Sequence, residues 1–566
     1  MLNIQEQYEL WLSKGDRETV AELREIASDE NEIKERFYRS LEFGTGGLRG
    51  VIGAGTNRIN GYTVRQATQA LANYLNRKGE GKRGVCISYD SRRYSDYFAR
   101  ETACVLAGNG IRAFLSDTLR PVPFLSYSVL HFKAAAGVMI TASHNPPKYN
   151  GYKAYCSTGE QIGPEMADEI MQEINKIDLF QDVKTMSIEQ ALERKLVVMM
   201  GTEVEDAYLN CVLAQRKNPD AAVQSNLKIV YTPLHGSGNI PVRRALSMAG
   251  YEHVYVVPEQ ELPDPAFSTV TSPNPEEKEG FALSIALADK VGADLIIGTD
   301  PDCDRVGVLV RDNQGAFQAL TGNQAGVILL EYLLSSSKLP RNGVVIKTIV
   351  STYLANEICK HYGVTVMDVL TGFKFIGEKI KEFEQSHEYT FLFGFEESYG
   401  YLCGTYTRDK DAVVASLLFA EAAAFYLGKG KSLLDVLDEI YQTYGAYRES
   451  LKAITMEGMA GLEKIKAITR SLRENPPEEM NGVLITAKED YLERKRTTKD
   501  GITPIPLPQS DVLRFELEDG SSFVVRPSGT EPKIKVYFAV VGKDTEDATK
   551  KLETFQKHVL DKILKD

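Results

Sequence analysis

The stretch AAGVMITASHNPPKYNGYK, residues 135–153, joins a short apolar run to a loop of polar residues and prolines. The run 135–140 has the length and composition of a buried strand, and the Asn-Pro-Pro that follows can continue neither a strand nor a helix. Ser143 is therefore predicted to lie where a buried strand breaks into a surface loop. Open α/β folds place ligand-binding residues at such strand ends, because a rigid sheet holds a loop that is free to meet a ligand.

Similar apolar runs, rich in residues that favour strands, recur along the chain and alternate with amphipathic stretches of helix length. They cover residues 84–90, 111–117, 228–236, 253–259, 294–300, 306–312, 344–352 and 389–397. Strands separated by helices predict α/β layers, and the pattern restarts several times, so we expect consecutive α/β domains. The end of the chain differs, because Glu518-Asp519-Gly520 is a strong hairpin signal between two apolar runs and predicts a smaller α+β domain.

The composition is that of an ordinary globular protein of several domains, with 566 residues of which 43% are hydrophobic. A net charge of -12 disfavours nucleic acid or an anionic membrane as the main partner. No apolar stretch is long enough for a membrane helix, and the first residues lack the pattern of a signal peptide. The seven cysteines include no C-x-x-C pair, which favours reduced thiols and predicts a cytoplasmic location.

A second strand end carries the acidic loop GTDPDCDR, residues 298–305. In extended backbone, Asp300, Asp302 and Asp304 project to one side, where a cation would offset their mutual repulsion. All-oxygen ligation suits Mg²⁺, whereas an EF-hand needs Gly and Glu where this loop has Arg305 and Arg311. Arg305 is also a candidate ligand for a phosphate oxygen. A solvated acidic turn is the other interpretation of this loop.

The chemistry of Ser143 depends on its neighbours. A serine hydroxyl is a poor nucleophile unless a base or a cation activates it, and His144 and Lys153 are the candidates. The alternative is a Ser/Asn/Pro turn in which Ser143 only caps backbone groups.

Three further segments offer groups that bind anions or hydroxyls. FGTGGLRG (residues 43–50) is a glycine-rich loop that carries Arg49, and a dinucleotide site is unlikely there because no strand precedes it. RPSGTEP (526–532) offers a guanidinium, hydroxyls and backbone N–H groups around a glycine, which suits a phosphate dianion. GFEESYG (394–400) ends an apolar run with paired carboxylates and a serine, which suit sugar hydroxyls. Each segment also fits a purely structural role, as a glycine turn or an acidic helix cap.

The order of these five segments along the chain resembles that in the α-D-phosphohexomutase family. The resemblance rests on TASHNP with NGYK downstream, on DPDCDR, GFEES and RPSGTEP, and on FGTGGLRG near the N-terminus. It implies an α/β fold class, with three consecutive α/β domains plus a smaller C-terminal α+β domain around one central cleft. The boundaries expected from the sequence are 1–203, 204–315, 316–444 and 445–566, and each domain would supply one loop to the cleft.

The resemblance also implies roles for individual residues. Ser143 would carry a phosphoryl group in the resting enzyme and, with Asp300, Asp302 and Asp304, hold one Mg²⁺ per chain. Arg49 and Lys153 would neutralise charge during transfer, and either His144 or Lys153 would move the proton. Substrate would be bound by Arg305, Thr371, Gly372 and Lys410, its sugar hydroxyls by Glu396 and Ser398, and its non-reacting phosphate by Arg526, Ser528, Gly529 and Thr530.

The implied substrates are small sugar phosphates. The segment TGFK (371–374) resembles the sugar-specificity loop of phosphoglucomutases, which implies that glucose 1-phosphate and glucose 6-phosphate are interconverted through a bound glucose 1,6-bisphosphate. Phosphopentomutase and phosphomannomutase activity stay open, because SYGY (398–401) resembles the branch that includes phosphopentomutases. More distant alternatives are an aspartyl-phosphate phosphatase with Asp300 as nucleophile and a non-catalytic sugar-phosphate binder. We expect a monomer or a weak homodimer.

Overall fold

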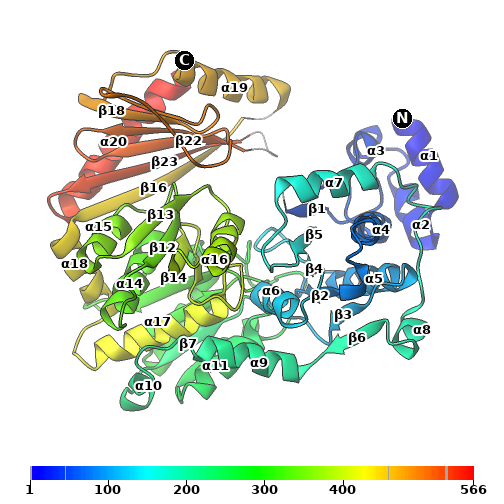
Figure 1. Ribbon diagram of the computed structural model, residues 1–566, viewed down its shortest axis with the longest axis horizontal. Coiled ribbons are helices and arrows are strands. Elements are labelled where there is room, and N and C mark those ends of the chain that lie inside the picture. The colour runs from blue at the N-terminus through cyan, green and yellow to red at the C-terminus, as the bar shows by residue number, and fades with distance from the viewer. Residues whose placement is uncertain (1–2, 45, 457, 529–532, 566) are drawn as a thin grey trace. The chain divides into compact units, whose positions relative to one another are not determined.

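The computed structural model describes residues 3–44, 46–456, 458–528 and 533–565 (Figure 1). The chain forms two compact units. The first contains Met1–Thr321, Ile376–Gly394 and Ser398–Gly430, and the second contains Gly322–Phe375, Phe395–Glu397 and Lys431–Asp566. Within the described ranges, no helix is both long and apolar enough to cross a membrane.

The first unit begins with a layer of three helices, α1 (Ile4–Lys14), α2 (Arg17–Glu25) and α3 (Glu30–Phe37). Each helix starts after a residue whose side chain accepts a hydrogen bond from the first turn, namely Asn3, Asp16 and Asp29. These caps satisfy N–H groups that have no partner within the helix. The apolar faces of the three helices meet around Trp11, which is fully buried.

A six-stranded sheet follows, with strand order β1-β5-β4-β2-β3-β6. Its strands are β1 (Gly47–Val51), β2 (Val85–Tyr89), β3 (Ala113–Ser116), β4 (Ala136–Ile140), β5 (Tyr149–Cys156) and β6 (Val197–Met200). Strand β2 is parallel to β3 and β4, and β3 is parallel to β6, whereas β5 pairs antiparallel with both β4 and β1. The helices around it are α4 (Gly61–Arg77), η1 (Gly81–Arg83), α5 (Ser95–Gly108), α6 (Val122–His131), α7 (Pro164–Ile174) and α8 (Ile188–Glu193).

The second sheet of this unit has five strands in the order β11-β10-β9-β7-β8. They are β7 (Ile229–Thr232), β8 (Val254–Val256), β9 (Leu295–Thr299), β10 (Val306–Arg311) and β11 (Phe317–Ala319). Strand β7 is parallel to β8 and β9, while β10 is antiparallel to β9 and β11. The helices of this region are α9 (Thr202–Leu213), α10 (Ala221–Gln224), α11 (Asn239–Met248), α12 (Pro258–Glu261), η2 (Lys278–Phe281) and α13 (Ala282–Val291).

Helix α17 (Ala412–Leu427) forms a buried support for the second sheet. Almost every residue of this helix is buried, and it contacts β9, β10, α9 and α11. Such a uniformly apolar helix is stable only inside a core. Before it in the chain come α16 (Lys374–Ser386), β14 (Thr390–Glu396) and β15 (Gly400–Leu402).

The second unit contains a parallel strand pair, β12 (Gly343–Thr348) and β13 (Thr365–Val369), connected by α15 (Leu354–Tyr362). Helices α14 (Gly322–Ser335) and α18 (Leu433–Tyr444) pack against each other, and both contact α15. A strand, a crossover helix and a parallel strand make up the unit from which α/β layers are built.

The rest of the second unit is an antiparallel sheet with helices α19 (Gly458–Glu474) and α20 (Thr545–Lys565). Its strands are β16 (Ala446–Thr455), β17 (Glu479–Met480), β18 (Val483–Asp490), β19 (Lys495–Thr498), β20 (Gly501–Pro504), β21 (Leu513–Leu517), β22 (Ser522–Pro527) and β23 (Lys533–Gly542). Helix α20 lies along β16 and β23 (Figure 1). Strands β21 and β22 form the hairpin predicted at Glu518-Asp519-Gly520. All eight strands predicted from the apolar runs are also present.

Candidate active site

Ser143 lies just after β4, in the turn that connects β4 to β5. Its backbone adopts a left-handed conformation with φ of 52°, and its N–H donates to the Thr141 hydroxyl over 2.8 Å. Ser143 Oγ donates to Asp300 Oδ2 over 2.7 Å and lies 3.2 Å from His144 Nδ1. The predicted strand end is confirmed, but the predicted surface position is wrong, because only 4% of Ser143 is exposed.

The loop folds inward because a buried arginine binds its backbone. The Arg92 guanidinium donates to four carbonyl oxygens of the loop, those of Ser143, Asn145, Pro146 and Tyr149. Asp90 Oδ2 lies 3.3 Å from Arg92 Nε and accepts a hydrogen bond from the Thr141 hydroxyl over 2.6 Å. One buried ion pair thus fixes the backbone on both sides of the serine.

The acidic loop between β9 and β10 is a tight turn, so the predicted extended backbone is wrong. Cys303 has a left-handed φ of 52°, and its N–H donates to the Asp300 carbonyl over 2.9 Å. Asp300 Oδ1 accepts the N–H groups of Asp304 and Arg305 over 3.1 and 3.0 Å. The three carboxylates are brought together by this turn and not by the alternation of side chains along an extended strand. One oxygen from each carboxylate lies within 4.8 Å of the corresponding oxygens of the other two.

This acidic cluster fits a hard cation. All three carboxylates are buried, and Oδ1 of Asp302 and of Asp304 has no hydrogen-bond donor in the described part of the chain. Leaving a buried carboxylate oxygen without a partner is costly, and ligation by oxygen alone suits Mg²⁺. Ser143 Oγ lies 2.7 Å from Asp300, so a phosphate on this hydroxyl would adjoin the same oxygens.

The three carboxylates differ in acidity. Burial, followed by the charges of Asp302 and Asp304, raises the pKa of Asp300 well above its usual value. Burial acts on Asp302 in the same direction, but the Lys153 ammonium, the hydrogen bond with Asp300 and the Lys410 charge together outweigh it and lower the Asp302 pKa. Burial and the Asp302 charge raise the pKa of Asp304. Asp302 is therefore the carboxylate that most strongly favours the charged form.

Two ammonium groups offset the charge of the cluster. Lys153, on β5, donates to Asp302 Oδ2 over 2.7 Å and lies 3.6 Å from Asp304. Lys410 Nζ lies 3.2 Å from Asp304 Oδ2 and 3.2 Å from Asp409 Oδ1. Burial would lower the Lys153 pKa, but the charges of Asp302 and Asp304 outweigh burial and raise it. Lys153 is therefore a cation at neutral pH.

Arg49, Arg305 and His144 complete the surroundings of Ser143. Arg49 lies on β1, where a loop was predicted, and its Nη1 is 3.4 Å from Asn145 Oδ1 of the serine loop. The Arg305 guanidinium pairs with Glu276. Burial, and then the charges of Arg305 and Arg49, lower the His144 pKa well below its usual value. The imidazole is therefore neutral at neutral pH.

In the second unit, the two predicted sugar-binding loops meet. Glu396 Oε1 at the end of β14 accepts the N–H of Gly372 over 2.9 Å. Gly372 has φ of +118°, a backbone conformation that glycine adopts readily, and Thr371 precedes it. The next carboxylate, Glu397, accepts hydrogen bonds from the hydroxyls of Thr348 and Ser351 over 3.1 and 3.4 Å.

The predicted phosphate loop is described as far as Ser528, whose N–H donates to the Lys533 carbonyl over 2.8 Å. Gly529 and Thr530 lie outside the described residues. Burial, and then the Glu397 charge, raise the pKa of Tyr537, whereas the Arg526 guanidinium opposes this shift and hydrogen-bonds to the phenol. Arg526 and Glu397 are thus both near Tyr537.

Ser398 lies in the turn between β14 and β15 and is partly buried. The next residue, Tyr399, has a left-handed φ of 65°, and its carbonyl accepts the N–H of Val306 over 3.1 Å. This turn therefore contacts β10 directly after the acidic loop.

The described contacts join Ser143, Lys153 and Lys410 to the acidic cluster within the first unit. His144 contacts Ser143, and Arg49 contacts Asn145 of the serine loop. In the second unit, Gly372 contacts Glu396. Sequence reasoning missed Asp90, Arg92, Thr141 and Asp409. The first two follow β2 directly, in YDSRR (89–93), and repeat the pattern of a polar loop after an apolar run. Asp409 accepts a hydrogen bond from the Tyr155 hydroxyl over 2.9 Å and contacts Lys410.

Comparisons with known families cover most of the chain. Family models of phosphoglucomutase/phosphomannomutase alpha/beta/alpha domains I, II and III match residues 40–181, 206–315 and 321–444, and the model of the C-terminal domain matches 463–553. The predicted fold class of three α/β domains and a C-terminal α+β domain is confirmed. The domain boundaries and the central cleft stay predictions.

Individual relatives match over nearly their full length. The chain is 38% identical over 533 residues to a phosphoglucomutase of Staphylococcus haemolyticus, which covers 94% of this chain and 95% of the relative. It is 37% identical over 548 residues to a phosphoglucomutase of Staphylococcus aureus, with 96% and 97% covered.

Solved structures share the fold. A phosphoglucomutase (parafusin) from Paramecium matches with a TM-score of 0.72 at 16% identity, covering 93% of this chain and 96% of that one. A putative phosphomannomutase from Thermus thermophilus matches with a TM-score of 0.69 at 22% identity, covering 93% and 100%. The chain belongs to the phosphoglucomutase/phosphomannomutase family, the α-D-phosphohexomutases that its sequence motifs resemble.

Proposed function

We propose that the protein is a phosphoglucomutase that interconverts glucose 1-phosphate and glucose 6-phosphate through a phosphoserine at Ser143. The observation that carries this proposal is the Ser143 hydroxyl, 2.7 Å from Asp300 inside a buried cluster of three carboxylates. Relatives named phosphoglucomutase, 37–38% identical over 94–96% of the chain, support the choice of substrate.

The reaction consists of two phosphoryl transfers. In the first, the bond between Ser143 Oγ and phosphorus breaks as the 6-hydroxyl of glucose 1-phosphate forms a bond to the same phosphorus. The 6-hydroxyl loses its proton and the departing Ser143 Oγ takes one up, so the net effect is a proton moved from the sugar to the serine. The product is bound glucose 1,6-bisphosphate, which turns around in the site. In the second transfer, Ser143 Oγ loses its proton and bonds to the phosphorus on O1 as the O1–phosphorus bond breaks, O1 takes up a proton, and glucose 6-phosphate leaves. The phosphoserine is restored, so no net phosphate is consumed.

The charges around Ser143 suit this transfer, because in-line phosphoryl transfer depends on positioning and on neutralising charge. Lys153 and Lys410 are cations held at the acidic cluster, and Arg49 reaches the serine loop from β1. Asp300, Asp302 and Asp304, together with a phosphate on Ser143, are the groups that would hold Mg²⁺. When bound, this ion supplies positive charge to the oxygens of the transferring phosphoryl group.

The structure favours His144 over Lys153 as the group that exchanges the serine proton. His144 Nδ1 is 3.2 Å from Ser143 Oγ, whereas the Lys153 ammonium donates to Asp302. A group must be within hydrogen-bond reach of the proton that it moves. Lys153 then acts as a fixed positive charge.

In the second unit, Glu396 and the TGFK loop would bind the sugar, and Arg526 with Ser528, Gly529 and Thr530 would bind the non-reacting phosphate. Support comes from the hydrogen bond between Gly372 N–H and Glu396, which orients the carboxylate beside the TGFK loop. Arg526 supplies a guanidinium, which matches the geometry of phosphate oxygens. Ser398 is the proposed second ligand for the sugar hydroxyls, and Arg305 a further phosphate ligand.

The test is turnover of glucose 1-phosphate, mannose 1-phosphate and ribose 1-phosphate side by side, each with its bisphosphate and Mg²⁺. We expect glucose 1-phosphate to have the highest kcat/KM and Ser143→Ala to abolish its turnover. A higher kcat/KM for mannose or ribose 1-phosphate would contradict the substrate assignment. Release of free phosphate without isomerisation would contradict the mutase assignment.

A further inference from the structure

A row of alternating charges leads away from the acidic cluster within the first unit. Lys153 Nζ lies 2.7 Å from Asp302 and 3.6 Å from Asp304 Oδ2. Lys410 Nζ lies 3.2 Å from the same oxygen of Asp304 and 3.2 Å from Asp409 Oδ1. Each ammonium is thus placed between two carboxylates, and the row leads to Asp409.

Asp409 is itself held in place. It is buried, its Oδ2 accepts a hydrogen bond from the Tyr155 hydroxyl over 2.9 Å, and its Oδ1 accepts the backbone N–H of Lys410 over 2.8 Å. Tyr155 follows Lys153 by two residues on β5, so both side chains project from the same face of the strand. Burial, and then the charges of Asp409 and Asp304, raise the pKa of Tyr155 well above its usual value. The phenol therefore stays a hydrogen-bond donor at neutral pH.

The backbone and the stem of Lys410 are fixed as well. The N–H of the next residue, Asp411, donates to the Tyr401 carbonyl over 2.9 Å. On β15, a Cβ at Gly400 would lie 2.0 Å from Lys410 Cδ, so this glycine leaves the space that the lysine stem occupies. The position of the ammonium then depends on the carboxylates that flank it.

A metal ion at the cluster would change the balance between the two carboxylates that flank Lys410. Asp304 is one of the three carboxylates that would hold the ion, and a nearby positive charge weakens the attraction between Asp304 and the ammonium. Asp409 is not one of the three, so it can keep the ammonium in place while Asp304 binds the ion. Without the charge of Asp409, the ammonium would pair with Asp304 and compete with the ion.

We infer that Asp409 is a positioning residue, which keeps the Lys410 ammonium beside the acidic cluster when Asp304 binds a metal ion. Tyr155 supports Asp409 in this role. The inference rests on the proposed mutase function, in which the ammonium offsets charge on the transferring phosphoryl group. Asp409 then acts only through Lys410.

A double-mutant cycle tests whether Asp409 acts through Lys410. Asp409→Asn keeps the shape of the side chain but removes its charge, and Lys410→Met removes the ammonium. We expect D409N to lower kcat for glucose 1-phosphate about tenfold, the effect of losing one hydrogen bond to a charged group, with little change in KM. In the K410M protein, D409N should lower kcat by less than about twofold. An equal effect of D409N in both proteins would overturn the inference.

The affinity for Mg²⁺ provides a readout that needs no turnover, and it is measured from the rise in Tm with Mg²⁺ concentration. We expect D409N to raise the Kd for Mg²⁺, because the ammonium then competes for Asp304, and to raise it less in the K410M protein. An unchanged Kd in D409N, or an equal rise in both proteins, would overturn the inference. Absence of turnover in the unchanged protein would contradict the proposed function, and the Mg²⁺ measurements would then decide the inference alone. If K410M does not fold, Gly400→Ala, which displaces the lysine stem, takes its place in the cycle.

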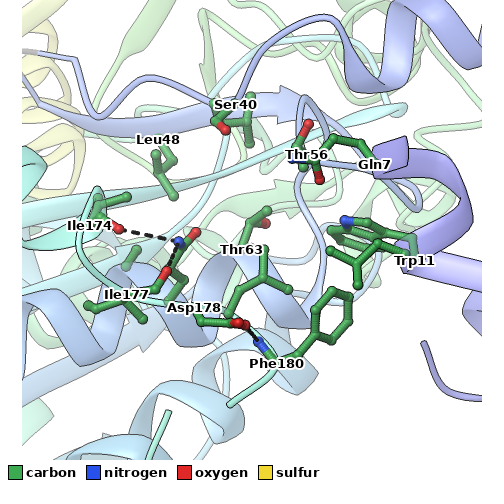
Figure 2. Close-up of a pocket in the computed structure, with 15 residues that line it drawn as sticks. Gln7, Trp11, Ser40, Leu48, Thr56, Thr63, Ile174, Ile177, Asp178 and Phe180 are labelled. Carbon is green, nitrogen blue, oxygen red and sulfur yellow. Dashed lines mark hydrogen bonds between the residues drawn. The ribbon is translucent and has the colours of Figure 1, made fainter. Parts of the chain in front are cut away.

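Tyr155→Phe tests the support for Asp409, because it removes the hydroxyl and keeps the buried ring. We expect kcat to fall about fivefold, the effect of losing one hydrogen bond. Tyr8→Phe is the matched control, since Tyr8 is also buried and its hydroxyl donates to the Leu23 carbonyl over 2.9 Å. It lies on α1, the helix that carries Trp11 (Figure 2), and Y8F should keep the kcat of the unchanged protein. Equal kcat values for Y155F and Y8F would overturn the role of Tyr155.

Discussion

Ser143 has a left-handed backbone, a conformation that costs a non-glycine residue about 1–3 kcal/mol and persists only where the surroundings impose it. The surroundings here are the Arg92 guanidinium and the Thr141 hydroxyl, which bind the backbone on both sides of the serine. The strained turn aims the hydroxyl at Asp300. At the scale of single residues, the site thus depends on a buried ion pair that does not itself touch the reacting oxygen.

Replacing Arg92 should affect stability and turnover together. Arg92→Met leaves Asp90 as an unpaired buried charge, so we expect the free energy of unfolding, measured by urea denaturation, to fall by about 3–5 kcal/mol. The exposed neighbour provides the control, because Arg93→Met should change this free energy by less than about 0.5 kcal/mol. Equal effects of the two substitutions would contradict the role given to Arg92.

Replacing His144 separates the two candidates for proton transfer. His144→Gln keeps a polar side chain but removes the base beside Ser143 Oγ, so we expect kcat to fall by about 10²–10⁴-fold with little change in KM. Steady-state kinetics in both directions provide the measurement. If kcat stays near that of the unchanged protein, Lys153 or another group moves the proton.

The sequence predicts Ser143, His144, Lys153 and the three aspartates as one site, since each follows or lies in a recognisable motif. It does not predict Arg92 or Asp90, because a buried ion pair and an exposed turn look alike in YDSRR (89–93). Arg305 was expected to bind phosphate, and in the structure its guanidinium pairs with Glu276, which lies 29 residues away. Such partners are decided by tertiary packing.

At the scale of elements, β1 determines where Arg49 lies. Local sequence predicts a glycine-rich loop at residues 43–50, but Gly47–Val51 pairs antiparallel with β5, with Arg49 opposite Gly151. At the acidic loop, by contrast, the sequence predicts the flanking strands β9 and β10 but does not predict the tight turn between them. Strands with long apolar runs can be predicted from the local sequence. A short edge strand such as β1 cannot, because it forms by pairing with a strand about a hundred residues away.

Gly47 tests the importance of β1. Its φ is +127°, and a Cβ there would lie 1.9 Å from the carbonyl oxygen of Tyr152, so Gly47→Ala must displace the strand. Because small displacements of charge-positioning groups can cost about 10²-fold in rate, we expect kcat to fall by up to that factor. Gly46→Ala is the matched control, since its Cβ would meet only the Gln161 side chain at 3.3 Å. A G47A protein as active as G46A would contradict the role of β1.

The acidic loop should couple Mg²⁺ to stability. Mg²⁺ at about 100 times its Kd should stabilise the protein by about 2.7 kcal/mol, seen as a rise in Tm that EDTA reverses. Asp304→Asn should lose this rise, because it replaces one of the three clustered carboxylates by an amide. Asp289→Asn, at an exposed carboxylate of α13, should respond like the unchanged protein. A Mg²⁺ response retained in D304N would contradict the metal site.

At the scale of the whole molecule, the groups proposed for catalysis and for substrate binding are divided between the two units. Ser143 and the acidic cluster belong to the first unit, and Glu396, the TGFK loop and Arg526 belong to the second. The motif order along the chain predicts four domains, but it cannot predict that residues 376–394 and 398–430 join the first unit, because that depends on packing between distant segments. Because the whole chain has a net charge of -12, only local groups of positive charge can attract an anionic sugar phosphate.

The most direct test of the account is to follow the phosphoryl group itself. The protein is incubated with glucose 1,6-bisphosphate labelled in its phosphate groups, and the labelled residue is located by mass spectrometry after rapid quenching. The account predicts label on Ser143, and its transfer to added glucose 1-phosphate or glucose 6-phosphate at least as fast as kcat. Label on Asp300, or full turnover without label on Ser143, would contradict the phosphoserine mechanism.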